Sequence, residues 1–149
     1  MASADRTYVD PSALRRQYVH DERSRAFCAW RARLGGALPI TRHGRAELVN
    51  SVCLAEFRRE VGQADARGIL ADLDADIEGG RLALVDVPWR RMLDQALRLT
   101  QTYTPTLGTR TLDVLHVASA QVLECRDFVT YDARQAALAE AVGLRVLRP

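Results

Sequence analysis

The chain contains no lysine, because all 21 of its basic residues are arginine, against 19 acidic residues. Biased codon usage is the simplest cause of this imbalance, although the planar guanidinium of arginine suits phosphate and carboxylate groups better than an ammonium group does. The formal net charge of +2 says nothing about how these charges are distributed over the surface.

Cysteine is also scarce, with Cys28, Cys53 and Cys125 forming no CxxC pair and leaving an odd number. This pattern argues against a secreted disulfide framework and against a thiolate zinc site, and it fits a reducing cytoplasm. The chain also lacks a run of about 18 apolar residues, and its charged start does not resemble a secretion signal. We therefore expect a cytoplasmic protein without a membrane span.

The composition is that of an ordinary globular domain, with 149 residues, 48% of them hydrophobic and 27% charged. No repeat or linker interrupts it, so we expect one domain over residues 1–149. Folding at this size buries roughly 70% of the surface of the unfolded chain, which is enough to form a core without a metal. Any bound metal is therefore expected to be functional.

Short apolar runs alternate with helical patterns along the chain, which is typical of a parallel sheet covered by helices. The predicted strands are 7–9, 37–41, 82–87, 127–130 and 145–147. The predicted helices are 12–18, 20–34, 45–61, 64–78, 89–102, 111–124 and 133–142. The sequence thus predicts an α/β fold with a central parallel β-sheet flanked by about seven helices.

Two acidic residues follow predicted strands, at the edge where open parallel sheets bind ligands. Asp10 comes directly after the first strand and precedes Pro11, and Asp132 lies just before the last predicted helix. Aspartate also caps helices well, so position alone leaves a structural role open for both residues.

Asp113 gives a sharper signal, because it lies in a helix with apolar residues on several faces. Burial of a lone carboxylate costs several kcal/mol unless cations or donors compensate it, so we interpret Asp113 as functional. Glu47 lies in the first turn of another predicted helix, where a solvated position is an equally good explanation.

These acidic residues could converge at one edge of the sheet, where a divalent cation would compensate their charges. Oxygen ligands without a His or Cys cluster favour Mg²⁺ or Mn²⁺ over Zn²⁺. Magnesium usually combines a few carboxylates with substrate phosphate oxygens, which points to phosphoryl chemistry.

Four motifs in order now indicate a family. The stretches are 8–14 (YVDPSAL), 45–48 (RAEL), 112–120 (LDVLHVASA) and 130–132 (TYD) followed by an alanine-rich helix and Gly143-Leu144. Together they resemble the PIN-domain ribonucleases of the VapC toxin type, over nearly the whole chain. Two features depart from the family pattern: arginine replaces a common lysine after the first acid, and the hydroxyl residue that usually precedes the second acid is displaced to Thr41 or absent.

The resemblance implies a metal-dependent endoribonuclease, the toxin of a type II toxin-antitoxin pair. Asp10, Glu47, Asp113 and Asp132 would be its catalytic residues and would hold one or two Mg²⁺ or Mn²⁺ ions. Ser12 and Thr130 would orient these carboxylates or water, although ordinary polar roles at a helix start and a strand end remain open.

RNA would be the substrate, and Arg15, Arg16 and Arg110 are the nearest candidates in sequence for binding its phosphates. The resemblance further implies a homodimer and a cognate VapB-like antitoxin. We expect His116 to be a core residue, because no second histidine stands at ligand spacing from it.

Three other functions remain to be compared with this one. A receiver domain is disfavoured because Pro11 follows Asp10 and lysine is absent, and a haloacid-dehalogenase-type phosphatase is disfavoured because Ser12 replaces its second aspartate. A catalytically silent PIN-like module that binds RNA or protein stays open as the alternative.

Overall fold

The computed structural model describes residues 3–149, and residues 1 and 2 of the expected 1–149 domain lie outside the described residues. The strands are β1 (Thr7–Val9), β2 (Leu38–Thr41), β3 (Leu82–Val85), β4 (Asp127–Val129) and β5 (Arg145–Leu147). The α-helices are α1 (Pro11–Leu14), α2 (Ser24–Arg33), α3 (Arg42–Phe57), α4 (Gln63–Glu78), α5 (Trp89–Leu107), α6 (Thr111–Val122) and α7 (Ala133–Ala141). Two 3₁₀ turns, η1 (Ala4–Arg6) and η2 (Arg15–Gln17), complete the described elements.

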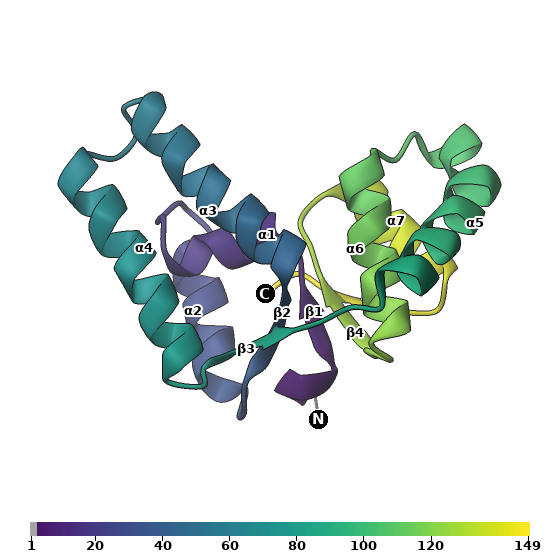
Figure 1. Ribbon diagram of the computed structural model, residues 1–149, viewed down its shortest axis with the longest axis horizontal. Helices are drawn as coiled ribbons and strands as arrows, with labels where there is room; N and C mark the ends of the chain where they lie inside the picture. The colour runs from purple at the N-terminus through teal and green to yellow at the C-terminus, as the bar shows by residue number, and fades with distance from the viewer. Residues whose placement is uncertain (1–2) are drawn as a thin grey trace.

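All strand pairs of the described chain are parallel, which confirms the predicted α/β class. The hydrogen-bonded ladders have the orders β1-β4-β5 and β2-β3, and β1 lies beside β2 where the two ladders meet. In Figure 1, α3 and α4 form one arm above the strands, and α5 and α6 form the other. No helix within residues 3–149 combines the length and apolarity that a bilayer crossing requires.

The core lies on both sides of the central strands, because alternate residues of a strand point to opposite faces. Tyr8 and Phe128 pack into the cluster beneath α5, α6 and α7, whereas their neighbours Val9 and Val129 pack into the cluster beneath α2, α3 and α4. The paired register Tyr8↔Phe128 and Val9↔Val129 keeps these two faces consistent between β1 and β4.

Several helix boundaries differ from those predicted. Helix α5 was expected to end at Thr102, but it runs through Pro105 to Leu107 and ends where Gly108 adopts φ 63°. Proline in the last turn sacrifices only one backbone hydrogen bond, and the left-handed glycine ends the helix with an N–H bond to the Thr104 carbonyl.

The two predicted helices near the N-terminus also differ. The predicted helix 12–18 is the short α1 followed by η2, and the predicted helix 20–34 starts only at Ser24. The Asp21 carboxylate accepts hydrogen bonds from the backbone N–H of Arg23 and from the Ser24 hydroxyl. This local bonding holds residues 21–23 in a turn that competes with helix formation.

Candidate active site

A cavity of about 420 Å³ lies at the carboxyl ends of β1 and β4. All four predicted carboxylates line it, namely Asp10, Glu47, Asp113 and Asp132. They come from four places in the chain: the end of β1, the second turn of α3, the first turn of α6 and the start of α7. Glu47 lies in the second turn and not, as predicted, in the first, because α3 begins at Arg42 after the Thr41 cap. Parallel strands bring their carboxyl ends to one edge, which is why residues so distant in sequence meet there.

Asp10 is 4% exposed and has a firm set of hydrogen-bond partners. Its Oδ2 accepts from the Ser12 backbone N–H at 3.0 Å and from the Ser12 hydroxyl. Its Oδ1 accepts from Nε2 of Gln135, a fully buried residue, at 2.9 Å. The Ser12 hydroxyl therefore contacts the carboxylate that it was predicted to orient, while sequence reasoning did not identify Gln135.

Asp132 caps α7, because its Oδ1 accepts from the backbone N–H groups of Arg134 and Gln135, both at 2.9 Å. The buried Thr130 hydroxyl accepts from the Asp132 backbone N–H at 3.1 Å. Asp132 thus combines the capping role that its position suggested with a place on the cavity wall, and Thr130 fixes the backbone beneath it.

Asp113 is 8% exposed, in agreement with the prediction that its helix is central. Its Oδ2 accepts from Nε of Arg110 at 2.9 Å and from the Arg110 backbone N–H at 3.3 Å. The Arg110 Nη2 also lies 3.5 Å from Oδ2 of Asp132. Its hydrogen bond with Asp113 raises the pKa of the Arg110 guanidinium, so a permanent cation spans two of the predicted carboxylates.

Glu47 is half-buried, and its Oε2 lies 2.7 Å from Nε2 of His116. This hydrogen bond, opposed by burial, holds the pKa of the Glu47 carboxyl below its usual range. His116 is buried as predicted, at 1% exposure, yet it also contacts a predicted site residue. The spacing between Glu47 and His116 in the sequence gave no sign of this long-range contact.

The four carboxylates do not form the tight cluster that we expected. Within residues 3–149, no three His, Cys, Asp or Glu side chains are grouped closely enough to hold one metal ion together. The carboxylates are instead paired with other side chains, Asp113 and Asp132 with the Arg110 guanidinium and Glu47 with the His116 ring. The all-oxygen donor set fits a hard divalent cation, and the Arg110 guanidinium supplies positive charge in the same cavity.

The cavity wall also contains the three predicted phosphate-binding residues, Arg15, Arg16 and Arg110. Nη2 of Arg15 lies 3.2 Å from Oε2 of Glu60. Nη1 of Arg16 donates to the Ser12 carbonyl oxygen at 2.6 Å. Sequence reasoning missed two further lining residues, Asp21 and Tyr131. The Arg16 guanidinium lies 4.3 Å from the centre of the Tyr131 ring, a contact that no local pattern indicates.

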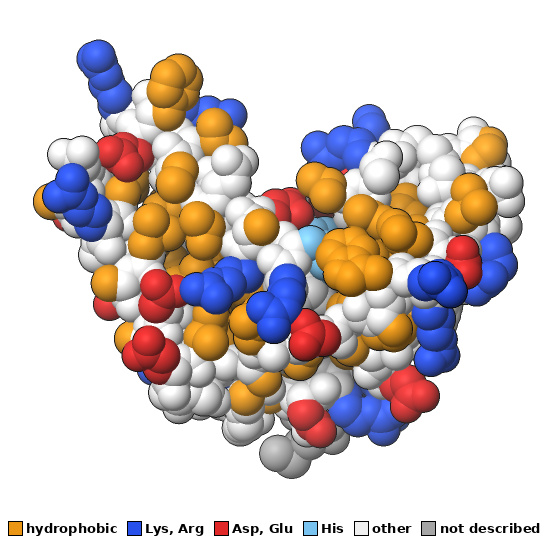
Figure 2. All heavy atoms as spheres, viewed as in Figure 1, with side chains coloured by type: hydrophobic (Ala, Val, Ile, Leu, Met, Phe, Trp, Pro, Cys, Tyr) orange, Lys and Arg blue, Asp and Glu red, His pale blue; other side chains and the backbone are white. Residues whose placement is uncertain are grey.

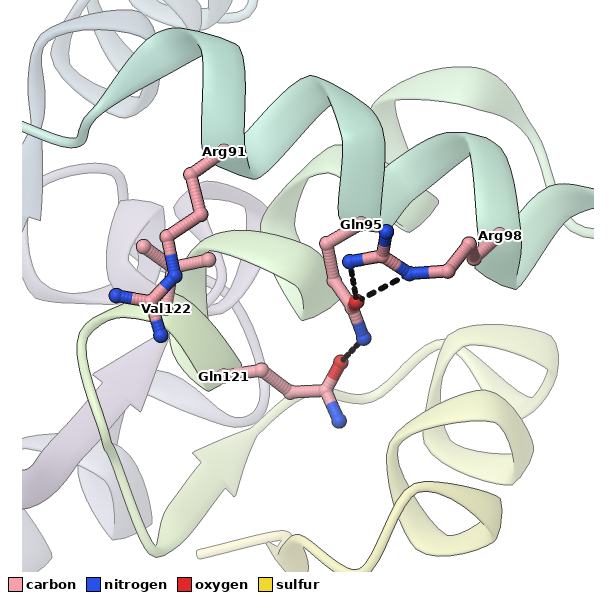
Figure 3. A pocket seen from close by; sticks show the side chains of 5 residues that line it. All are labelled: Arg91, Gln95, Arg98, Gln121 and Val122. Atoms are coloured by element: carbon pink, nitrogen blue, oxygen red, sulfur yellow. Dashed lines mark hydrogen bonds between the residues drawn. The ribbon is translucent and has the colours of Figure 1, made fainter.

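The surrounding surface is hollowed between the two helical arms, and apolar side chains are visible on the walls of the hollow (Figure 2). A separate hollow of about 200 Å³ between α5 and α6 is shown in Figure 3. It is lined by Arg91, Gln95, Arg98, Gln121 and Val122. Because no carboxylate lines it, this second hollow offers no site for a hard cation.

Comparisons with known proteins agree with this architecture. No protein-family model matches the chain, and no curated protein sequence matches it. Among solved structures, the crystal structure of FitAcB from Neisseria gonorrhoeae is similar to it, with a TM-score of 0.64 and 17% sequence identity. The similarity covers 95% of this chain and 96% of that chain. The chain therefore shares its fold with that structure, and this fold is of the α/β class that the sequence predicted.

Proposed function

We propose that the chain is a metal-dependent endoribonuclease of the VapC toxin type and that residues 1–149 form one PIN domain. The main support is that Asp10, Glu47, Asp113 and Asp132 line a single cavity although they are far apart in sequence. A purely structural role does not explain why four carboxylates face one cavity at the sheet edge where ligands bind.

These four carboxylates would form the metal site, with at least two of them binding the cation directly and Mg²⁺ or Mn²⁺ as the ions that match oxygen ligands. When bound, such an ion lowers the pKa of a coordinated water and stabilises charge on a phosphate. The chain's own residues prepare the site: Ser12 and Gln135 hold Asp10 in place, and the α7 backbone holds Asp132. Fixed carboxylates need little reorganisation when a cation enters.

RNA binding would depend on the arginines of the cavity wall. Arg15, Arg16 and Arg110 surround the carboxylates, where they can contact phosphates on either side of the scissile bond. Single-stranded or looped RNA is the expected substrate, because its backbone can enter a recessed site. Arg110 would then exchange its carboxylate partners for a phosphate when the cation neutralises Asp113 and Asp132.

The family resemblance also leads us to propose a homodimer and a small cognate VapB-like antitoxin, in the cytoplasm. Exposed apolar side chains support a protein partner of this kind. Trp89, Leu93 and Leu97 lie four residues apart along α5 and are 47%, 49% and 58% exposed. A stripe of this type on one helix face marks an interaction surface.

Incubation of the purified protein with mixed RNA tests the proposal. We expect internal cleavage with Mg²⁺ or Mn²⁺ and intact RNA with EDTA. The pairing of Arg110 with two of the carboxylates favours one second candidate, a PIN-like module that binds RNA or protein without cleaving. Intact RNA under all three conditions, together with RNA binding in a gel-shift assay, would favour that module and overturn the nuclease.

A further inference from the structure

Both ring nitrogens of His116 are hydrogen-bonded inside the protein. Nε2 lies 2.7 Å from Oε2 of Glu47, and Nδ1 lies 2.7 Å from the hydroxyl of Tyr8. His116 is 1% exposed and Tyr8 is 2% exposed, so water does not compete for the two ring nitrogens. The two bonds connect α6 to α3 on one side of the ring and to β1 on the other.

The chemistry of the two partners determines which nitrogen carries the proton. An ionised carboxylate can only accept, so the proton faces Glu47 on Nε2. In the neutral ring Nδ1 is then an acceptor, and the Tyr8 hydroxyl must donate to it. The result is a directed chain from Tyr8 through His116 to Glu47.

Aromatic packing fixes the orientation of this chain. The Tyr8 ring stacks on Phe128 with ring centres 5.5 Å apart and the planes 1° from parallel. The His116 ring stacks on His43 with centres 5.1 Å apart and the planes 21° from parallel. Tilting either ring would break these stacks, so they hold the ring planes, while the two hydrogen bonds determine which nitrogen of His116 faces Glu47.

We propose that His116 is a positioning residue that holds the Glu47 carboxylate at the acidic cavity, in a tautomer that this carboxylate sets and the Tyr8 hydroxyl supports. The inference rests on the proposed function, because it concerns the metal affinity of that same site. Glu47 is long and half-buried, and Nε2 of His116 is its one hydrogen-bond partner among the described residues. Removal of such a partner from a metal-binding carboxylate weakens affinity by about 10- to 100-fold.

The first test is a spectroscopic signature that needs neither metal nor RNA. The chain has only 3 histidines, so ¹⁵N NMR can assign the ring nitrogens of each. We expect His116 in wild-type protein to be protonated on Nε2 and unprotonated on Nδ1, and we expect Glu47→Gln, whose amide can donate or accept, to yield a mixture of tautomers. A wild-type His116 with its proton on Nδ1, or averaged between both nitrogens, overturns the proposal.

The second test measures Mn²⁺ affinity by calorimetry in the wild type, His116→Gln and His116→Leu. The glutamine amide can place a donor near the position of Nε2, whereas leucine fills the space without one. We expect at least a 10-fold loss of affinity for His116→Leu and a loss of less than about 3-fold for His116→Gln. Circular dichroism and the melting temperature establish that each variant folds.

The outcomes separate the positioning role from the proposed function. If the wild type binds Mn²⁺ and His116→Leu binds it equally well, the positioning role is overturned alone. The same conclusion follows if folded His116→Gln loses as much affinity as His116→Leu. If His116→Leu does not fold, an affinity of His116→Gln more than 3-fold below the wild type overturns the role. If the wild type itself does not bind Mn²⁺, the metal site fails and the inference fails with it.

Discussion

Replacement of Asp113 by asparagine should lower the rate of RNA cleavage about 100-fold while leaving the fold intact. The change removes one negative charge from the cavity and keeps the shape of the side chain. The ion pair that is lost joins Asp113 to the Arg110 side chain, which is 71% exposed. Ion pairs with such an exposed partner contribute no more than about 1 kcal/mol to the free energy of unfolding. The asparagine oxygen can still accept from the Arg110 backbone N–H, so the start of α6 is preserved.

The expected loss of about 1 kcal/mol is small beside the roughly 5–15 kcal/mol by which domains are stable, and it lowers the melting temperature by about 2–4 °C. The effect on catalysis is much larger, because loss of a carboxylate ligand weakens the charge stabilisation that a metal supplies. A loss of 3 kcal/mol of transition-state stabilisation corresponds to a rate about 100-fold lower. Cleavage of a fluorescent RNA at saturating Mg²⁺ measures this rate.

Asp127→Asn is the matched control for this variant. Asp127 is also a buried aspartate paired with an exposed arginine, with Arg145 Nε and Nη2 at 2.7 and 2.9 Å. It lies at the start of β4, whereas the cavity lies at the carboxyl end of that strand. We expect Asp127→Asn to lose stability and to keep full cleavage activity. Wild-type activity in Asp113→Asn, or its failure to fold, would refute the reasoning.

Three further predictions concern pH, charge and metal. Burial, with the nearby His116, lowers the pKa of His43 from 6.5 to about 4, despite an opposing effect of Glu47. Because the pKa of His43 is lower in the folded state than in the unfolded state, the free energy of unfolding is at its full value above pH 6.5 and decreases as the pH falls from 6.5 towards 4. After discounting for the partial exposure of His43, this decrease is about 1–2 kcal/mol. Urea unfolding at several pH values should show this loss in the wild type and a flatter profile in His43→Gln; equal slopes would contradict the assignment. Arg110→Gln should bind Mn²⁺ about 3- to 10-fold more tightly, because a competing cation leaves the cavity, and it should bind RNA more weakly. Arg67→Gln on α4 is the control, and unchanged Mn²⁺ affinity in Arg110→Gln would show that the guanidinium does not compete. Finally, Mn²⁺ at about 100 times its dissociation constant should stabilise the protein by about 2.7 kcal/mol, and EDTA should reverse the shift in melting temperature. A melting temperature insensitive to both reagents would contradict a folded-state metal site.

The fold was largely predictable because its signals are local and periodic. Short apolar stretches around Tyr8 and Phe128 form two of the paired strands. Because helical patterns separate them in the sequence, they indicate a parallel sheet without reference to tertiary structure. Positions directly after strands also have a predictable place, which is why Asp10 and Asp132 meet at one edge. Helix ends were less predictable, because a turn stabilised by Asp21 and a tolerated Pro105 depend on specific hydrogen bonds.

The sequence predicted several of the residues that line the cavity, and it predicted their contacts less well. The burial of Asp113 follows from the apolar residues around it in α6. The partner of Glu47 does not, because His116 is 69 residues away and meets it only through the tertiary arrangement that brings the two side chains together. Arg110 was predicted to contact substrate phosphate, and its pairing with Asp113 depends on a side-chain conformation that no spacing specifies.

Crystallography of the protein with Mn²⁺, using the anomalous signal of the ion, tests most directly whether the acidic cavity is a metal site. The account predicts an anomalous peak coordinated by oxygens of at least two of the four carboxylates, with Arg110 withdrawn from Asp113. A structure with no peak there, in crystals soaked in millimolar Mn²⁺ and with Arg110 still paired to Asp113, would contradict it.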